Sequence, residues 1–388
     1  MQRLPFILVM VGALGLAQGL TPQAALERLF TQPPAKVEWF SPVFLNQVSI
    51  EQINALLPQL TQGLGKYQGV RPDGPNFVVE FEQGLIPAQI ALDPQGRITG
   101  LFFRPAQPKT VRSLEQILAE YQSLPGQVSL LVLEDAQPRL SLNPDLPLAI
   151  GSTFKLAVLE ALQVQIQAGK RKWGDTVALE AAWKSLPSGT MQNTPDGTTF
   201  SLEQYASQMI SISDNTAADS LIHIVGRSSI EALTPRNRPF LTTREAFILK
   251  NPANKDMLER YRKADPAGRT ALLPEIDQLP LPKAEVFAGG PVATDIEWFF
   301  STSELCSLME KVQALPLMSL NPGVANPADW QKVAYKGGSE PGVLNLTTYL
   351  IAKNGKHYCV SATWNNPQAA LEENKFLLLY SELLTDLK

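Results

Sequence analysis

Apolar and polar residues follow two different periods in the first hundred residues of the chain. From about residue 20, apolar residues recur at helical spacing, and they then alternate with polar residues in short runs. Helices followed by a run of strands predict a small α+β domain over residues 20–107, with the helices on one face of an antiparallel sheet. The helices are expected at 21–30 and 49–67, and the strands at 76–84, 86–93 and 97–105.

A second α+β domain is predicted over residues 108–388, after the proline-containing linker RPAQPKT. Its first and last strands are expected to form one antiparallel sheet that is flanked by the two terminal helices, and a long helical lobe is inserted between them. The cleft of such a fold lies between sheet and lobe. Helices are expected at 113–122, from Ser152, through much of the middle to about 315, and within 365–384; strands are expected at 127–135, 139–152, 331–338 and 342–364.

Three short sequence motifs locate helix starts and a turn within this second domain. Ser113 and Gln116 have the spacing of a capping box, which marks a helix start. Asn354-Gly355 splits residues 342–364 into a β-hairpin. Asn366 followed by Pro367 predicts the cap and first turn of the last helix.

The first 19 residues have the layout of a cleaved signal peptide. Arg3 precedes a short apolar run, and small residues follow at Ala17 to Gly19. The run is too short for a comfortable membrane span, although an uncleaved anchor remains the alternative. We therefore expect an exported protein, periplasmic or extracellular, without a stable membrane span.

Composition and net charge indicate what kind of protein this is and which binding partners it is unsuited to. The 388 residues are 44% apolar and 18% charged, as in a folded globular protein. A formal net charge of −4 and the lack of a basic stripe argue against nucleic acid as a partner. The two cysteines, Cys306 and Cys359, fit a disulfide in an exported protein, and they fit buried free thiols equally well.

The chain has only two histidines, His223 and His357, and we interpret both as structural. A site with several histidine ligands is excluded, and no metal or cofactor is expected. A Ser-His-Asp triad has few candidates, so a nucleophilic serine would need a different base.

Ser152 and Lys155 meet that need, because residues three apart on a helix share a face. A serine at a helix start also lies beside free backbone N–H groups, which stabilise an oxyanion. Lys155 would act as a base if burial and a second cation lowered its pKa. By itself the pattern is more typical of an ordinary N-cap.

Two further motifs could complete such a site. Ser213-Asp214-Asn215 lies at a break between two predicted helices and offers a hydroxyl for proton relay and a carboxamide for an amide substrate. Lys336-Gly337-Gly338-Ser339 ends a strand, and its glycines let a ligand approach the backbone. The alternatives are a helix cap for the first motif and a strand-to-turn exit for the second.

Together and in this order, STFK, SDN and KGGS resemble the motifs of the serine penicillin-recognising enzymes, above all the class A β-lactamases. The resemblance covers roughly residues 108–388. It implies an α+β class A β-lactamase-like fold, an acylated Ser152, Lys155 as its general base and Ser213 as the proton relay.

The same resemblance assigns the substrate-binding residues. Asn215 would anchor the substrate amide, and Lys336 would face the substrate carboxylate. The backbone N–H groups of Ser152 and Ser339 would form the oxyanion hole, beside Gly337 and Gly338.

The sequence departs from that family at two positions. Gly337 replaces the usual threonine or serine, which removes a hydroxyl that binds the substrate carboxylate. The deacylating glutamate has no match in its usual context, and Glu245 is the nearest candidate for activating the hydrolytic water. A helix-start acid is the alternative interpretation of Glu245.

The first domain resembles, more loosely, a steroid-isomerase or cystatin-like module. Such a module precedes a class A-like domain in a group of esterases linked to clavam biosynthesis. The sequence thus predicts an exported serine hydrolase that acts on a small-molecule substrate, a β-lactam amide or an ester of a related molecule. The alternatives are a D,D-peptidase acting on cell-wall peptides and a binding protein for β-lactams or such peptides without efficient turnover.

Overall fold

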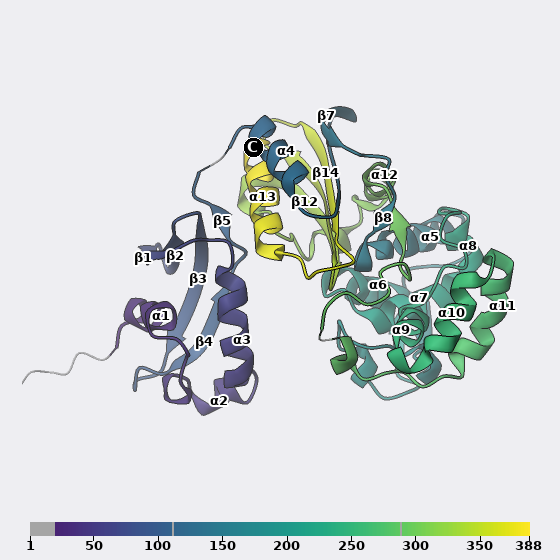
Figure 1. Cartoon of the computed structure of the whole chain (residues 1–388), viewed down its shortest axis with the longest axis horizontal. Helices are drawn as coiled ribbons and strands as arrows, with labels where there is room; N and C mark the ends of the chain where they lie inside the picture. The colour runs from purple at the N-terminus through teal and green to yellow at the C-terminus, as the bar shows by residue number, and fades with distance from the viewer. Residues whose placement is uncertain (1–19, 111, 288) are drawn as a thin grey trace, which may run out of the picture. The chain divides into compact units, whose positions relative to one another are not determined.

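The computed structural model describes residues 20–110, 112–287 and 289–388, which fold into two compact units (Figure 1). One unit ends at Lys109 and the other begins at Thr110. The predicted signal peptide, residues 1–19, lies outside the described residues. Within the described ranges, every helix is too short or too polar to cross a membrane.

The first unit is an antiparallel sheet with helices packed on it. Its strands follow the order β1-β2-β3-β4, β5 pairs with β3, and α1 packs on β1 and β3. The helix predicted to reach residue 67 ends at Thr61, because Gly63 and Gly65 turn the chain with positive φ. The elements are α1 Pro22–Thr31, α2 Pro42–Leu45, α3 Ile50–Thr61, β1 Tyr67–Asp73, β2 Asn76–Phe81, β3 Gly84–Leu92, β4 Ile98–Phe103 and β5 Gln107–Pro108.

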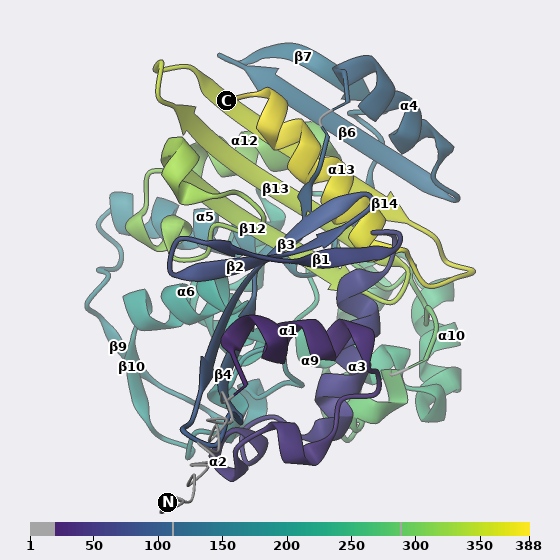
Figure 2. The same cartoon turned by 90° about the vertical axis from the view of Figure 1, so that its left-hand side faces the viewer.

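The second unit contains the predicted antiparallel sheet, which has five strands in the order β12-β13-β14-β6-β7. Figure 2 shows β6 and β7, from the start of this unit, beside β14 from its end. The predicted hairpin at Asn354-Gly355 is confirmed, since β13 and β14 pair on either side of it. The strands are β6 Gln127–Glu134, β7 Gln137–Leu142, β12 Trp330–Glu340, β13 Val343–Ala352 and β14 His357–Asn365.

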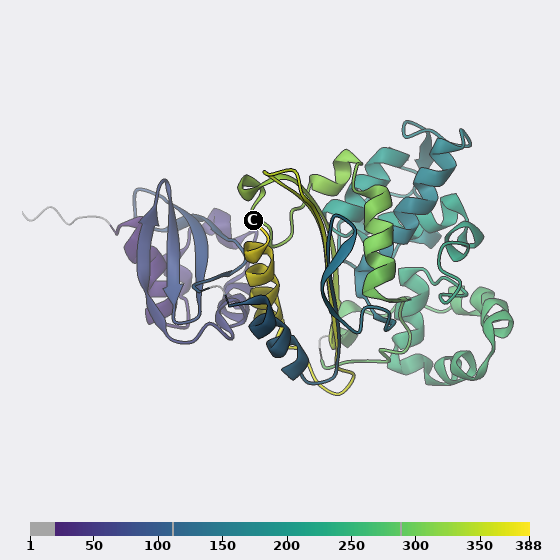
Figure 3. The same ribbon diagram turned by 90° about the horizontal axis from the view of Figure 1, so that it is seen from above.

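Helices cover both faces of this sheet, and each face has its own apolar core (Figure 3). On one face lie α4 (Leu114–Ser123), which begins with the predicted capping box of Ser113 and Gln116, and α13 (Glu373–Asp386). On the other face lies α12 (Thr302–Val312), with the helical lobe behind it. The sheet, the two terminal helices and the helical lobe are thus arranged as the sequence predicts.

The lobe contains helices α5 to α11, together with two short strand pairs, β8/β11 and β9/β10. A disulfide between Cys306 and Cys359 joins α12 to β14, so the structure shows the first of the two alternatives for these cysteines. The elements are β8 Leu148–Ala149, α5 Lys155–Gln167, β9 Thr176–Ala178, β10 Thr199–Ser201, α6 Leu202–Ser211, α7 Asn215–Val225, α8 Arg227–Glu231, α9 Thr243–Lys250, α10 Lys255–Lys263, α11 Pro266–Asp277 and β11 Phe299–Phe300.

The predicted start of the last helix was wrong. Helix α13 begins at Glu373, and Asn366 instead closes a local turn in which its Oδ1 accepts the backbone N–H of Gln368 at 3.0 Å. An asparagine before a proline serves a turn as well as a helix cap, so local chemistry alone does not separate the two.

Candidate active site

Ser152 lies in a single turn of 3₁₀ helix, Gly151–Phe154, which runs directly into α5. The α-helix predicted from Ser152 therefore begins three residues later, at Lys155. The tighter turn keeps the two side chains together, with Lys155 Nζ 3.1 Å from Ser152 Oγ.

Lys155 is fully buried, and polar atoms surround its Nζ. Two of them accept hydrogen bonds and cannot donate: the Ser213 carbonyl oxygen at 2.6 Å and Asn215 Oδ1 at 2.7 Å. The other two are the hydroxyls of Ser152 and Ser213, each at 3.1 Å. A neutral amine satisfies this arrangement, because it donates two hydrogens to the carbonyl oxygens and accepts one from a hydroxyl.

Burial lowers the pKa of Lys155 well below its ordinary value, and the nearby charge of Lys336 lowers it further. The carboxylates of Asp219 and Asp214 act in the opposite direction. Burial also lowers the pKa of Lys336, to about 7. Both lysines are thus brought toward the neutral form, which is the form that accepts a proton.

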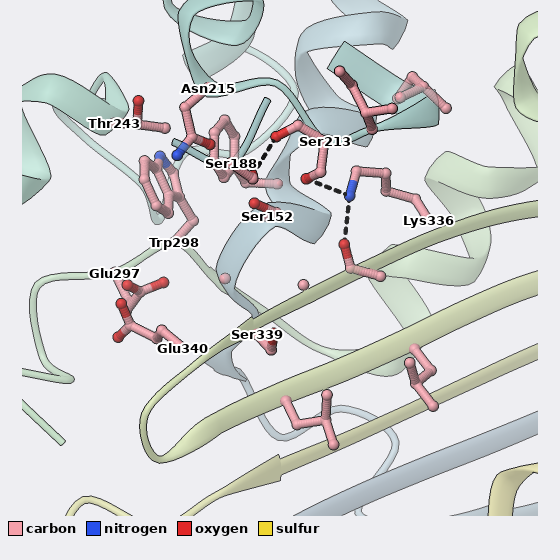
Figure 4. Close-up of a pocket in the computed structure, with 18 of the residues that line it drawn as sticks. Ser152, Ser188, Ser213, Asn215, Thr243, Glu297, Trp298, Lys336, Ser339 and Glu340 are labelled. Atoms are coloured by element: carbon pink, nitrogen blue, oxygen red, sulfur yellow. Dashed lines mark hydrogen bonds between the residues drawn. The ribbon is translucent and has the colours of Figure 1, made fainter. Parts of the chain in front are cut away.

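Ser213 lies between the two lysines, with its Oγ 3.1 Å from Lys155 Nζ and 3.0 Å from Lys336 Nζ. Its φ of 58° is in the left-handed region, which is unfavourable for a serine. The surrounding contacts hold this conformation: its carbonyl oxygen accepts hydrogen bonds from Lys155 and from Ser188 Oγ, the latter at 2.7 Å (Figure 4). The strained backbone directs the hydroxyl toward both lysine nitrogens.

Asp214 and Asn215 support this arrangement from the start of α7. Asp214 caps the helix through Ala217 N at 2.8 Å, and its other oxygen accepts the N–H groups of Thr190 and Met191. Asn215 accepts from Lys155 and donates to the Leu186 carbonyl oxygen at 3.0 Å. Its carboxamide, which the sequence analysis assigned to substrate binding, therefore holds Lys155 in place.

Strand β12 is an edge strand, and it runs past the nucleophile (Figure 4). At Gly338 a side chain would overlap the Ile150 carbonyl oxygen and the Ser152 nitrogen, so only glycine permits this approach. A Cβ on Gly151 would lie 3.0 Å from Ser339 N. The backbone nitrogens of Ser152 and Ser339 thus lie on adjoining segments, as an oxyanion hole requires.

The STFK, SDN and KGGS motifs meet at one cavity of about 520 Å³, and Glu245 does not belong to its lining. Gly337, like its neighbours in the KGGS motif, belongs to its lining. Tyr335 lies against Gly337 from the same strand. Residues that line the cavity include Ser152, Ser213, Asn215, Lys336, Gly338 and Ser339.

Glu245 lies elsewhere. Its carboxylate is 1% exposed and forms a two-point ion pair with Arg227, at 2.7 and 3.1 Å. The same carboxylate accepts the backbone N–H of Thr242 at 2.7 Å in a capping box at the start of α9. The helix-start interpretation thus fits its position, and we assign no hydrolytic water to Glu245.

Three charged residues at the cavity were missed by the sequence analysis. Lys250 Nζ contacts Glu297 Oε1 at 2.5 Å and both carboxylate oxygens of Glu340, at 2.6 and 2.7 Å. One signal was available, because Lys336, Gly338 and Glu340 alternate along β12 and share a face. Lys250 and Glu297 lie far away in sequence and give no local pattern.

Both histidines lie outside the lining of this cavity. His223 stacks on Trp183, with ring centroids 5.4 Å apart. His357 Nδ1 lies 2.7 Å from the hydroxyl oxygen of Tyr349. Across the described part of the chain, the His, Cys, Asp and Glu side chains form no group of three or more suited to a metal ion.

Comparison with solved structures finds proteins that align with most of this chain but share a low sequence identity with it. A beta-lactamase from Sphaerobacter thermophilus is 20% identical, with 71% of this chain and 97% of that chain covered and a TM-score of 0.49. A beta-lactamase from Chitinophaga pinensis is 16% identical, with 70% and 97% covered and a TM-score of 0.49. A class A beta-lactamase representative from Bacteroides cellulosilyticus is 18% identical, with 70% and 94% covered and a TM-score of 0.46.

A search of curated proteins finds no match. The model of a protein family does match, over less than half of the chain, and the match includes the STFK and SDN motifs. Residues 109–264 are thus similar to Beta-lactamase2, the beta-lactamase enzyme family.

Proposed function

We propose that the protein is an exported serine hydrolase of the β-lactamase and penicillin-binding-protein kind, and that it works through an acyl-Ser152 intermediate. The observation that carries this proposal is the position of the Lys155 amine, buried and 3.1 Å from the Ser152 hydroxyl. The family match over residues 109–264 supports it. The substrate is a β-lactam amide or an ester of a related molecule.

In the acylation step, Ser152 Oγ attacks the carbonyl carbon and its proton passes to Lys155 Nζ. The Oγ–carbon bond forms, and the negative charge on the carbonyl oxygen is stabilised by the N–H groups of Ser152 and Ser339. When the bond to the leaving nitrogen or oxygen breaks, the proton reaches that atom through the Ser213 hydroxyl. Lys336 supports the relay at 3.0 Å and attracts the carboxylate of the substrate.

In the deacylation step, water adds to the acyl carbon and the Ser152 hydroxyl is restored as the acid is released. Glu245 is held by Arg227 away from the cavity lining and is not available to activate that water. This position favours a second candidate function, in which the protein binds β-lactams or cell-wall peptides as a long-lived acyl-enzyme. The lifetime of the adduct separates the two functions.

The proposal is tested by intact-protein mass spectrometry. The purified protein is mixed with a penicillin, with an ester-bearing cephalosporin and with a peptide ending in D-Ala-D-Ala, and adduct and products are followed over time. Ser152→Ala removes the nucleophile, and Ser123→Ala on the far end of α4 is the matched control.

We expect an adduct on the peptide that contains Ser152, absent in Ser152→Ala and retained in Ser123→Ala. A short-lived adduct identifies a hydrolase, and a persistent one identifies the binding protein. Loss of the cephalosporin ester side chain with an intact ring identifies an esterase, and cleavage of the peptide identifies a D,D-peptidase. An adduct of equal yield in Ser152→Ala would contradict the proposed nucleophile.

A further inference from the structure

The cavity has a second polar end, formed by Lys250, Glu297 and Glu340, which the proposed acylation step does not use. Lys250 is the last residue of α9, Glu297 lies just before β11, and Glu340 ends β12. All three line the cavity that contains Ser152. Figure 4 shows the Glu297 and Glu340 side chains next to each other, below Trp298.

This end of the cavity has more carboxylates than cations. The only cation that bonds Glu297 and Glu340 among the described residues is Lys250. Burial and the neighbouring Glu297 carboxylate raise the pKa of Glu340 to about 8, so one proton is retained near neutral pH. Lys250 thus balances one of the two carboxylates, and the retained proton neutralises the other.

The buried carboxylate of Glu297 shows where an incoming donor would bind. Its side chain is 2% exposed, and its Oε2 is buried without a hydrogen-bond donor among the residues that the structure describes. The proton retained on Glu340 hydrogen-bonds to Glu297, so a donor from outside the chain has to replace that proton, and a charged ammonium donor does so favourably. The Glu340 side chain, 21% exposed, lies on the accessible side of the same cluster.

The strand places this cluster at a defined distance from the nucleophile. Gly338 contacts Ser152, and Glu340 lies two residues further along the same face of β12, about 7 Å away. Lys336 lies two residues in the opposite direction. A substrate acylating Ser152 thus has Lys336 on one side and Glu340 on the other.

We propose that Glu297 and Glu340 form a recognition site for a primary ammonium group on the substrate, which replaces the proton held between the two carboxylates. A primary ammonium matches the site because it carries one positive charge and three donors, enough for the free Glu297 oxygen and the Glu340 carboxylate. This inference deepens the proposed function, on which its biological meaning rests. It names the substrate class as acyl compounds that bear a primary amine on the side of the reacting carbonyl that faces Glu340.

Proton release should accompany binding. Glu340 is neutral below its pKa of about 8, and an ammonium group favours its ionised form. Affinity for an amine therefore rises as the pH increases toward 8, and a proton is released below that pH. The titratable groups that face Glu340 are Glu297 and Lys250, and the others lining the cavity are Tyr335, Lys336 and Glu373.

The test compares two ligands by isothermal titration calorimetry. The ligand 4-(aminomethyl)phenylacetamide carries an ammonium across a para-substituted ring from its carbonyl, and 4-(hydroxymethyl)phenylacetamide is its neutral counterpart. Glu340→Gln leaves Lys250 and Glu297 as a balanced pair, and its amide donates to the free oxygen. Glu275→Gln, which removes an equal charge from exposed α11, is the matched control.

We expect the amine to bind at least about tenfold more tightly than the alcohol, or about 1.4 kcal/mol. Glu340→Gln should abolish this preference and Glu275→Gln should keep it. Buffers of different ionisation enthalpy should reveal the released proton in the wild-type protein, which keeps the test decisive if Glu340→Gln does not fold. Equal affinity for the two ligands, or a preference that survives Glu340→Gln, would overturn the inference.

The test is independent of turnover. A Ser152 adduct without any amine preference would leave the proposed function standing and refute the ammonium site. An amine preference without a Ser152 adduct would support the site and refute the proposed function.

Discussion

Lys155 and Lys336 share one hydroxyl: the Ser213 Oγ lies 3.1 Å from the first ammonium nitrogen and 3.0 Å from the second. A cation so close to a buried amine lowers the affinity of that amine for a proton. The pKa of Lys155 is depressed first by burial and then by the charge of Lys336. A neutral Lys155 amine next to Ser152 fits the general-base role proposed for it.

This relationship predicts the effect of Lys336→Met on the pH dependence of acylation. Removing the neighbouring charge raises the pKa of Lys155, so its neutral form is populated only at higher pH. The ascending limb of the acylation rate against pH should therefore move to higher pH, and the rate near neutral pH should fall. Lys332→Met on the same strand, whose lysine contacts Gln313, is the control. A limb that stays in place would show that the charge of Lys336 does not help to set the pKa of Lys155.

Gly338→Ala tests the close approach of β12 to the nucleophile. The new Cβ would overlap Ile150 and Ser152 and would lie 2.6 Å from Thr153 N, so the strand must move away. We expect acylation to slow by about 10²–10³-fold, the usual effect of a lost oxyanion donor. Overpacking should also cost about 1–3 kcal/mol in the free energy of unfolding.

Stopped-flow acylation and urea denaturation measure these two effects separately. Gly174→Ala is a suitable control, because a Cβ there meets no atom within 4 Å. Wild-type acylation in Gly338→Ala would mean that the Ser339 N–H does not contribute to an oxyanion hole.

Asn215 gives a prediction that separates positioning from substrate binding. Asn215→Asp places a carboxylate where a neutral oxygen now accepts from Lys155 at 2.7 Å. The added negative charge should raise the pKa of Lys155 and move the acylation profile to higher pH. Asn215→Ala should instead lower the rate by about 10–100-fold at every pH, since one partner of a buried hydrogen bond is lost. A change confined to KM in both variants would indicate that Asn215 serves only to bind substrate.

Sequence reasoning succeeded where local spacing determines the contact. The Asn354-Gly355 hairpin and the Ser113 capping box depend on neighbouring residues, and both are present. The Ser152 and Lys155 side chains meet because the two residues lie three positions apart in a tight helical turn. These predictions needed only backbone geometry.

It failed where the contact depends on the path of the whole chain. Lys250 meets Glu297 across 47 residues and Glu340 across 90, so no window of sequence contains the cluster. Asn366-Pro367 failed for another reason, because a turn and a helix cap use the same chemistry. Glu340 alone could have been found, since it alternates with Lys336 and Gly338 along β12.

Glu245→Gln separates a structural glutamate from a catalytic one. The carboxylate is 1% exposed and paired with Arg227, which is 22% exposed, so the substitution leaves a partly buried cation without its partner. We expect the free energy of unfolding to fall by about 1–3 kcal/mol, because the exposure of Arg227 reduces the loss found for fully buried pairs. Glu275→Gln, in an exposed pair with Arg260, should change stability little.

The decisive comparison for Glu245 is between stability and deacylation. Urea denaturation should show the loss of stability, while the lifetime of the acyl-Ser152 adduct, followed by mass spectrometry on folded protein, should match that of the wild type. The reason is spatial: Arg227 and the Thr242 N–H hold the carboxylate at the start of α9, outside the cavity lining. If the adduct of Glu245→Gln persisted much longer than that of the wild type at equal stability, the carboxylate would have to reach the hydrolytic water by moving away from Arg227.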